Sequence, residues 1–399
     1  MKKILLSLIA LIGLSLSLQS QITAPKFGKG IQILGKDSSY YSKIGYRFQN
    51  LYIGEWTSKD GSLTDYDASF FVRRQRLKFN GWAHSPKIQY KLELAFSNRD
   101  NSGGTGPEFR RAANIVLDAS VSYNFYKNWT IQFGQRKLPG NVERVISSGN
   151  LQFVDRSRLN SRYNIDRDVG LQLKHHHKIG ETFLMREIVA FSQGEGRNVT
   201  EGYFGGFNLT YRVEFLPFGA FQSKGDYIGS AIKYEEKPKL SVCFTYDNNN
   251  NSVRERGQLG SFITDGDGNY VGKTLNTFFA DMMFKHKNLS IMAEYAHKQT
   301  DDDDPFVLDA DGNEIGTFFT GTGLNVQGGY MTGKGWEVAY RYTNIQPDEG
   351  VSRDETQHTF GINKFIVGHK LKIQTDFTLI NRDGSDDIFV WRTQVDVHF

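Results

Sequence analysis

The chain has 399 residues, with 48 Lys or Arg and 44 Asp or Glu, so its formal net charge is only +4. Mean hydropathy is low, at −0.47, although aromatic residues make up 14% of the chain. This combination suits a transmembrane β-barrel with a polar lumen, but a soluble β-sandwich or propeller could share it. The single cysteine, Cys243, excludes an internal disulfide framework, and we interpret it as a small buried or membrane-facing side chain.

The N-terminus has the pattern of a secretory signal peptide. Lys2 and Lys3 precede an apolar run that extends from residue 4 to about residue 18, and small and polar residues follow. The run is shorter than the ~20 residues that a transmembrane helix needs. We therefore expect residues 1–20 to be a signal peptide, cleaved after Ser17 or Ser20, and residues 21–399 to form one barrel domain in the outer membrane.

Alternation with a period of two recurs through the rest of the chain. In the segments 88–96 and 117–125, apolar or aromatic residues alternate with polar ones. Because successive side chains of a strand point to opposite faces, the pattern predicts one lipid-facing and one lumen-facing side, and 9–12 residues cross a bilayer. The predicted strands are 45–54, 68–82, 87–98, 113–127, 129–137, 168–177, 183–192, 207–215, 239–247, 275–287, 289–299, 323–332, 335–345, 356–366, 369–380 and 388–399. Tyr90, Leu92, Leu94 and Tyr123 should face lipid, and Lys91, Glu93 and Asp118 should face the lumen.

The links between these strands are short and long in turn, as expected when turns lie in the periplasm and loops lie outside. The long links are 55–67, 99–112, 138–167, 193–206, 248–274, 300–322 and 346–355. The segment 227–235 also looks strand-like, but counting it would place the loop 248–274 on the wrong side. We therefore assign 216–238 to an unusually long periplasmic connection. The predicted fold is all-β, an antiparallel barrel of sixteen strands with both termini in the periplasm.

The chain ends on an amphipathic strand. Phe389, Trp391, Val395, Val397 and Phe399 alternate with residues that are mostly polar. A last strand of this kind, ending in an aromatic residue, resembles the closing strand and assembly signal of bacterial outer-membrane barrels.

A first basic cluster lies in the predicted strand 68–82. Arg74, Arg76 and Lys78 share one face, which must point into the lumen because charged side chains on the lipid face cost roughly 2–4 kcal/mol near the midplane. Lys91 lies on the polar face of the next strand. These side chains could form a wall for anions, or they could be neutralised by acids such as Glu93 and Asp118, and the sequence does not choose between the two.

A second basic cluster lies in and around the long link 138–167. Residues 136–167 contain seven Lys or Arg and three Asp or Glu. We expect this loop to fold inward and narrow the pore, because rings of basic side chains at a constriction select anions. The alternative is a surface loop that binds lipopolysaccharide or nothing. The basic residues concerned are Arg136, Lys137, Arg144, Arg156, Arg158, Arg162 and Arg167.

Several segments together resemble the phosphate-selective porin O and P family. They are FVRRQRL (71–77), GQRKLP (134–139) with Glu143 and Arg144, RDVG (167–170) and EFLPFG (214–219). The resemblance covers nearly all of the chain after residue 20. It implies a sixteen-stranded outer-membrane porin, a homotrimer in the membrane lipid that passes small anions such as phosphate or pyrophosphate. The C-terminal strand, in turn, leads us to expect insertion by the barrel-assembly machinery. Its anion pathway would use the lumenal Arg and Lys side chains named above.

The remaining sequence patterns give weaker evidence of function. Two loops, 265–272 and 309–316, repeat an Asp-x-Asp-Gly-Asn pattern whose oxygens could hold calcium, but the glycine is one position too early for an EF-hand and the residues are typical of hairpin tips. In the run 175–177 we interpret three histidines as the edge of an interfacial turn rather than as a metal site.

We find no nucleophile motif and expect no enzyme and no cofactor. The remaining alternatives are a non-selective porin and a receptor or adhesion barrel that acts through its long loops.

Overall fold

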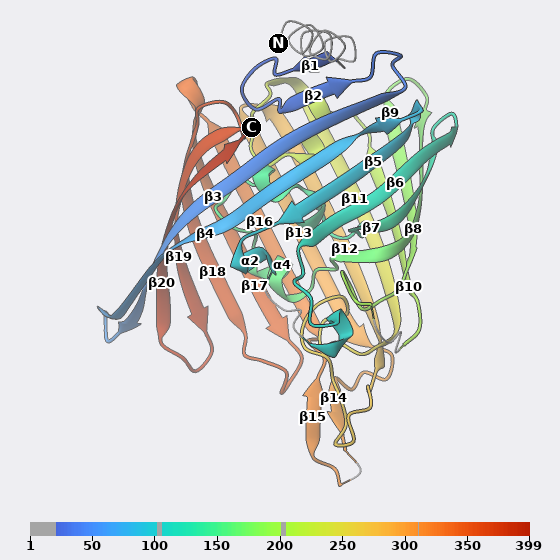
Figure 1. Ribbon diagram of the computed structural model, residues 1–399. Coiled ribbons are helices and arrows are strands. Elements are labelled where there is room, and N and C mark those ends of the chain that lie inside the picture. The colour runs from blue at the N-terminus through green and yellow to red at the C-terminus, as the bar shows by residue number, and fades with distance from the viewer. Residues whose placement is uncertain (1–20, 102–105, 201–204, 310) are drawn as a thin grey trace, which may run out of the picture.

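The computed structural model describes residues 21–101, 106–200, 205–309 and 311–399, and shows a closed antiparallel β-barrel (Figure 1). Its sixteen strands confirm the predicted fold class. The barrel strands are β3 (Tyr40–Lys59), β4 (Ser62–Ala83), β5 (Ser85–Ala95), β6 (Val116–Tyr126), β7 (Trp129–Lys137), β8 (Arg167–Ile179), β9 (Phe183–Ser192), β10 (Asn208–Leu216), β11 (Glu235–Ser252), β12 (Lys273–Lys287), β13 (Leu289–Thr300), β16 (Gly321–Met331), β17 (Trp336–Pro347), β18 (Glu355–Phe365), β19 (Leu371–Arg382) and β20 (Asp387–His398). The barrel closes where β20 pairs with β3, for example Val395 opposite Asn50.

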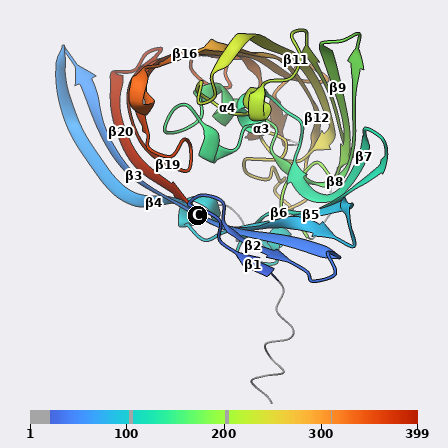
Figure 2. The ribbon, with the colours of Figure 1, turned by 90° about the horizontal axis from the view of Figure 1, so that it is seen from above.

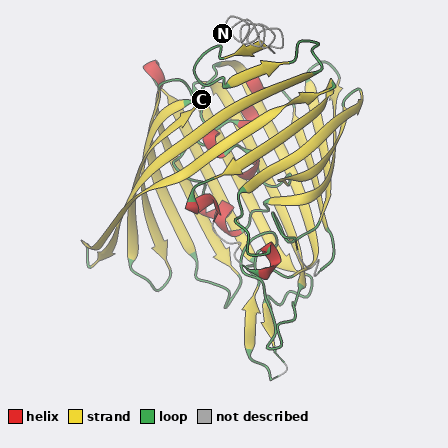
Figure 3. Ribbon diagram, in the orientation of Figure 1, coloured by secondary structure: helices red, strands yellow, loops and turns green. Residues whose placement is uncertain are grey.

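Four further strands lie outside the ring of sixteen. A hairpin of β1 (Gln21–Thr23) and β2 (Ile31–Leu34) pairs with the start of β3, and β14 (Phe306–Leu308) pairs with β15 (Glu314–Thr317) in a long loop. The short helices are α2 (Asn98–Asn101), η2 (Pro107–Phe109), α3 (Val142–Val145), η3 (Ser148–Asn150), α4 (Arg158–Arg162), η4 (Gln222–Tyr227) and η5 (Gly333–Gly335), and several lie inside the barrel outline (Figure 3). Within the described residues, no helix is long and apolar enough to cross a membrane.

The two faces of each strand follow the predicted alternation. Tyr123 and Phe133 are 46% and 64% exposed on the outside, whereas Glu93 and Asp118 are 2% and 1% exposed toward the lumen. Aromatic side chains this exposed are stable in lipid rather than in water, because burying apolar surface is favourable. The outer face is therefore the membrane-facing surface.

The two ends of the barrel differ as the link lengths predicted. The start of the described chain and the C-terminus lie at the same end, and the β14–β15 hairpin projects from the opposite end (Figure 1). Between 217 and 234 the chain contains η4 but no strand, so the connection between β10 and β11 lies on the short-turn side. This confirms the choice of sixteen strands over seventeen.

One predicted loop is wrong. The segment 55–67 is not an open loop, because β3 and β4 continue to a tight turn at Asp60 and Gly61, with Ser58 paired to Leu63. The polar residues that suggested a loop continue the backbone ladder, and strand pairing requires no apolar side chain once the hairpin leaves the membrane. β3 and β4 are accordingly 20 and 22 residues long.

The C-terminal residue lies at the seam where the barrel closes. The Phe399 backbone N–H donates to the Tyr46 carbonyl oxygen over 2.8 Å, and its ring lies 5.7 Å from that of Phe27 and 6.1 Å from that of Phe48. Deleting Phe399 removes both kinds of contact from the seam. We expect this deletion to lower the heat-modifiable, membrane-inserted fraction in outer-membrane preparations.

The matched control is Phe27→Ala, which removes one ring contact but keeps the seam hydrogen bond. It should insert nearly as well as the wild type. Unchanged insertion of the deletion variant would show that the last residue carries no assembly signal.

Candidate functional site

The loop between β7 and β8 folds into the barrel and crosses its lumen. Figure 2, which views the barrel from above, shows α3 and α4 inside the ring of strands. Gln152 connects this inward loop (residues 138–166) to the far wall. Its side-chain amide donates a hydrogen bond to Glu337 over 2.9 Å. Its backbone carbonyl oxygen accepts hydrogen bonds from the side chains of Asn363 and Gln374, each over 2.8 Å. The inward loop is therefore held by strands that lie far from it in sequence.

Apolar contacts fix the inward loop against one half of the wall. Leu138, Leu159 and Tyr163 pack with Phe279 and Ile345, and all five side chains are buried. A second cluster joins the loop to the same half of the wall and to the connection 217–234. It contains Val142, Ile146, Leu151, Leu216, Phe221, Met283 and Met292. These clusters fill the side formed by β9–β13 and part of β17, and the open passage is lined mainly by β3–β8 and β18–β20, with a few residues of β9 and β10.

A cavity of about 710 Å³ remains between the inward loop and the wall. Its lining contains seventeen Arg or Lys and seven Asp or Glu side chains, so basic residues exceed acidic ones by ten. The basic residues are Arg73, Arg74, Arg76, Lys78, Lys91, Arg99, Arg136, Lys137, Arg144, Arg156, Arg158, Arg167, Lys174, Arg197, Arg212, Arg382 and Arg392. The acidic ones are Glu55, Glu93, Asp100, Asp118, Asp155, Asp166 and Glu214.

Ten of the eleven residues that the sequence assigned to an anion pathway line this cavity. The exception is Arg162, which we expected near the narrowest point. Its guanidinium instead lies 4.6 Å from the centre of the Phe319 ring, at the end of α4, where it is held over an aromatic face outside the lining. Arg158, one turn earlier, points into the cavity and pairs with Glu355 over 3.0 Å.

Sequence reasoning missed Arg73, because it placed this residue on the face opposite to Arg74. The pairing of β3 with β4 shifts by one residue here, from Gln49 opposite Arg74 to Asn50 opposite Val72. Such a β-bulge leaves one residue unpaired and redirects its side chain. Arg73 and Arg74 consequently both reach Asp155 of the inward loop, over 3.1 and 3.0 Å.

Part of the basic lining is neutralised by acids on the wall. The Glu93 carboxylate accepts ion pairs from Arg76 at 3.0 Å, Lys91 at 3.1 Å and Lys78 at 3.3 Å. Asp118 pairs with Lys91 and, over 2.8 Å, with Arg167. Arg76 also pairs with Asp100 over 2.7 Å, and Arg167 lies 3.8 Å from Asp166. This cluster is therefore largely neutralised, and the positive excess of the cavity lies in the rest of its lining.

The inward loop brings one acid into contact with the arginines of β4. Burial disfavours the charge on Asp155, but Arg73 and Arg74 outweigh burial and hold the pKa of its carboxyl well below its usual range. Asp155 is therefore ionised and fixes the loop against the basic wall.

Other lining cations have no carboxylate partner. Lys137 donates to the carbonyls of Arg144 and Ile146 over 2.7 and 3.1 Å, and Lys174 donates to the Gln132 side chain over 2.7 Å. Within the described residues, no hydrogen bond or ion pair is formed by the side chain of Arg136. These positive charges face the same cavity, so an anion entering it would meet uncompensated donors.

Arg156 of the inward loop belongs to this group. Its guanidinium donates to the carbonyls of Glu143 and Ile146 over 2.9 and 2.8 Å. Burial, followed by the nearby charges of Arg144 and Arg74, lowers the pKa of Arg156. Burial is the main cause of this shift, and repulsion by the two neighbouring arginines adds to it.

The connection 217–234, between β10 and β11, also enters the barrel and meets the inward loop. The Gly229 N–H donates to the Asn150 carbonyl over 2.7 Å, and Ser230 donates to Glu337 over 2.8 Å. The two inward segments therefore meet at Gly229 as well as in the apolar cluster that contains Phe221. A Cβ at this position would lie 2.7 Å from the Gln152 backbone nitrogen, too close for any side chain.

We therefore expect Gly229→Val to push the connection 217–234 away from the inward loop and to raise single-channel conductance. Planar-bilayer recording of the purified variant measures this directly. Gly333→Val is the control, because a Cβ at Gly333 of a short turn meets no atom within 4 Å. Conductance equal to that of the wild type in Gly229→Val would mean that the connection does not limit the bore.

The two Asp-rich loops use their first acid to shape a turn. Asp265 Oδ1 accepts from the backbone N–H groups of Asp267 and Asn269 over 3.0 and 2.7 Å, and Asp309 does the same with Asp311 and Asn313. This geometry is the ordinary Asx turn of a loop tip. It gives a structural reason for the repeated pattern.

A closed barrel with a lipid-facing exterior and a charged passage narrowed by an inward loop defines an outer-membrane channel. The model of the phosphate-selective porin O and P family matches residues 39–387, and the chain belongs to this family. No relative was found among curated protein sequences. Family and fold indicate a channel rather than an enzyme, located in the outer membrane.

Solved porin structures share the fold at low sequence identity. The outer membrane channel DcaP of Acinetobacter baumannii is 13% identical with a TM-score of 0.54, covering 91% of this chain and 99% of its own. The anion-selective porin from Comamonas acidovorans is 10% identical with a TM-score of 0.52, covering 90% of this chain and 100% of its own. Salmonella typhi OmpF in complex with daunomycin is 12% identical with a TM-score of 0.55, covering 92% of this chain and 100% of its own. At these identities the likeness concerns the fold alone.

Proposed function

We propose that this porin passes small anions in preference to cations, with phosphate or pyrophosphate as the leading solutes. The observation that supports the proposal is the lining of the cavity, where seventeen basic side chains stand against seven acidic ones. Fixed positive charge around a narrow passage raises the local anion concentration and repels cations. The pathway uses Arg74, Arg76, Lys78, Lys91, Arg136, Lys137, Arg144, Arg156, Arg158 and Arg167, together with Arg73 and Lys174.

Phosphate is favoured over a simple halide by the type of side chain. Arg presents a planar fork that matches two phosphate oxygens, and it stays charged at any relevant pH. Exchange between several weak sites along the wall would let each anion leave again, which conduction requires. No energy source or cofactor is needed for diffusion of this kind.

The competing function is a general porin without ion preference. It is favoured by the ion pairs of Glu93 and Asp118, which neutralise part of the wall. The two functions differ in what the unpaired cations do. Arg136 is the best probe, since its removal breaks no interaction within the described part of the chain.

Arg136→Gln should weaken the block of chloride current by inorganic phosphate about fivefold, because one charge at close range is worth about 1 kcal/mol in water-like surroundings. The measurement is a phosphate titration of the chloride conductance in planar bilayers. The matched control is Lys364→Gln, which removes one charge on the outer side of the barrel, where Lys364 lies over Trp336. A wild-type channel that phosphate does not block, or an equal effect of both variants, would favour the general porin.

We also propose that the chain is exported through residues 1–20, is inserted by the barrel-assembly machinery and forms a homotrimer in the outer-membrane lipid. Residues 1–20 lie outside the described part of the chain. The proposal on the assembly rests on the family to which the chain belongs. Gel filtration in detergent together with cross-linking would test the trimer.

A further inference from the structure

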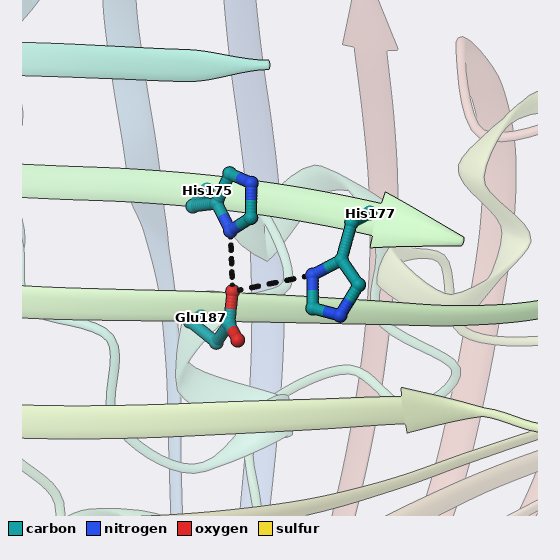
Figure 4. Close-up of side chains that lie close together, drawn as sticks. All are labelled: His175, His177 and Glu187. Carbon is teal, nitrogen blue, oxygen red and sulfur yellow. Dashed lines mark hydrogen bonds and ion pairs between the residues drawn. The ribbon is translucent and has the colours of Figure 1, made fainter. Parts of the chain in front are cut away.

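A cluster of metal-ligating side chains lies on the outer face of the barrel, away from the lumen. His175 of β8 is directly opposite Glu187 of β9, and His177 lies two residues further along β8 (Figure 4). Alternate residues of a strand share a face, so His175 and His177 lie on the same side as Leu171 and Leu173, which are exposed. His176 takes the opposite side.

The three side chains converge on one point. The Nδ1 atom of His175 lies 2.7 Å from Glu187 Oε2, and the Nδ1 atom of His177 lies 3.7 Å from the same oxygen. One ligand atom from each of the three residues falls within 4.8 Å of the others. Ligand atoms around a tetrahedral zinc ion are about 3.3 Å apart, which follows from bond lengths of about 2.0–2.1 Å. Only small side-chain movements separate the cluster from this geometry.

One ligand atom is already buried without a hydrogen-bond partner. The Nδ1 of His177 is shielded from solvent, and no atom of the described residues bonds to it. The rings are held in place by stacking: His175 lies 4.2 Å from Trp129 at 18° and 5.2 Å from His177 at 21°. A buried imidazole nitrogen without a partner, aimed at a carboxylate, is a feature that a bound cation would explain.

We propose that His175, His177 and Glu187 bind a divalent transition-metal ion, with zinc as the best fit. Two imidazole nitrogens and one carboxylate form a ligand set typical of zinc sites that keep an open position for water. In binding, His175 carries its proton on Nε2 and presents the free Nδ1 electron pair to the metal, so both histidines remain neutral.

The position of the cluster gives the ion a structural role. The site links β8 to β9 beside the short turn at 180–182 and next to Trp129, an interfacial type of residue. An ion there would neutralise a carboxylate that faces outward from the barrel. It would also stabilise the folded barrel, since it binds three ligands that only the folded chain brings together.

The test is zinc titration of the full-length detergent-solubilised barrel, without a histidine tag, by calorimetry. The wild type should bind one equivalent of zinc, and the same site should give the visible absorption of tetrahedral cobalt when Co²⁺ replaces it. His177→Gln and Glu187→Gln should each lose this binding while remaining heat-modifiable. His176→Gln is the matched control and should bind as the wild type does.

The outcomes separate clearly. Stoichiometric binding that is lost in His177→Gln and Glu187→Gln, and kept in His176→Gln, supports the site. No saturable binding by the wild type overturns the proposal. Binding that persists in His177→Gln and Glu187→Gln, or that disappears in His176→Gln, overturns it as well, because the ion would then be held elsewhere.

Discussion

Replacing Arg136, Arg144 and Arg158 together with Gln should lower the chloride-over-potassium preference of the channel about tenfold in dilute salt. Three charges leave the cavity lining, and the excess of basic over acidic residues falls from ten to seven. Removal of Arg144 and Arg158 also takes one cationic partner away from Asp166 and one from Glu355, so the surroundings of the cavity become less positive. Each charge contributes about 1 kcal/mol at close range in water-like surroundings, partly screened by salt.

The matched control for this triple variant is Arg162→Gln. Arg162 belongs to the same inward loop but stacks on Phe319 outside the lining, so its loss should leave selectivity nearly unchanged. The effect of the triple variant should also shrink in concentrated salt, because the Debye length falls from about 10 Å at 0.1 M to about 3 Å at 1 M. A triple variant with unaltered preference would refute the role of these three side chains.

The second large effect concerns stability. Arg212→Ala should lower the free energy of unfolding by about 3–5 kcal/mol, because it leaves buried acids without their partner. Arg212 is only 3% exposed. Its guanidinium donates two hydrogen bonds to Asp281, over 2.8 and 3.0 Å, and one to Glu214 over 2.8 Å. It also donates to the Gly140 carbonyl over 2.8 Å and so anchors the inward loop.

Urea unfolding of the detergent-refolded barrel, followed by heat-modifiable migration, measures this loss. Asp281→Ala and the double variant complete a thermodynamic cycle, in which the double variant should be more stable than the two single losses together would predict. Lys273→Ala is the control, since its partners Asp302 and Asp304 are about half exposed and such a pair contributes less than about 1 kcal/mol. Equal losses for Arg212→Ala and Lys273→Ala would contradict the buried-network interpretation.

The barrel itself was predictable from alternation and link length. β7 and β9 have the bounds that the sequence predicted, 129–137 and 183–192, because both cross the membrane with a clear apolar face and each begins directly after a short turn. The limits of β3 and β4 were not predictable, since their outer halves continue as a hairpin beyond the membrane. There the backbone ladder and cross-strand contacts such as the stacking of Trp56 on Tyr66, at 4.8 Å, maintain the strands, and no alternation marks their ends.

The site was predictable where it lies on a strand and less so where it lies in a loop. Lys174, Arg212 and Arg392 occupy the polar faces of predicted strands, so the same alternation rule could have found them. Arg99 and Arg197 lie in loops, where no periodicity indicates direction. The direction of the Arg73 side chain depends on a β-bulge, and that of Arg162 depends on its contact with Phe319. Neither the bulge nor the contact leaves a signal in the sequence.

The most direct test of the central claim, that the lumen prefers anions, is the zero-current potential of the wild-type channel across a potassium chloride gradient. The basic excess around the cavity predicts a potential of the sign set by chloride, and one that grows as both solutions are diluted. A potential near zero, or one of the sign set by potassium, would contradict the anion preference and leave a general outer-membrane porin.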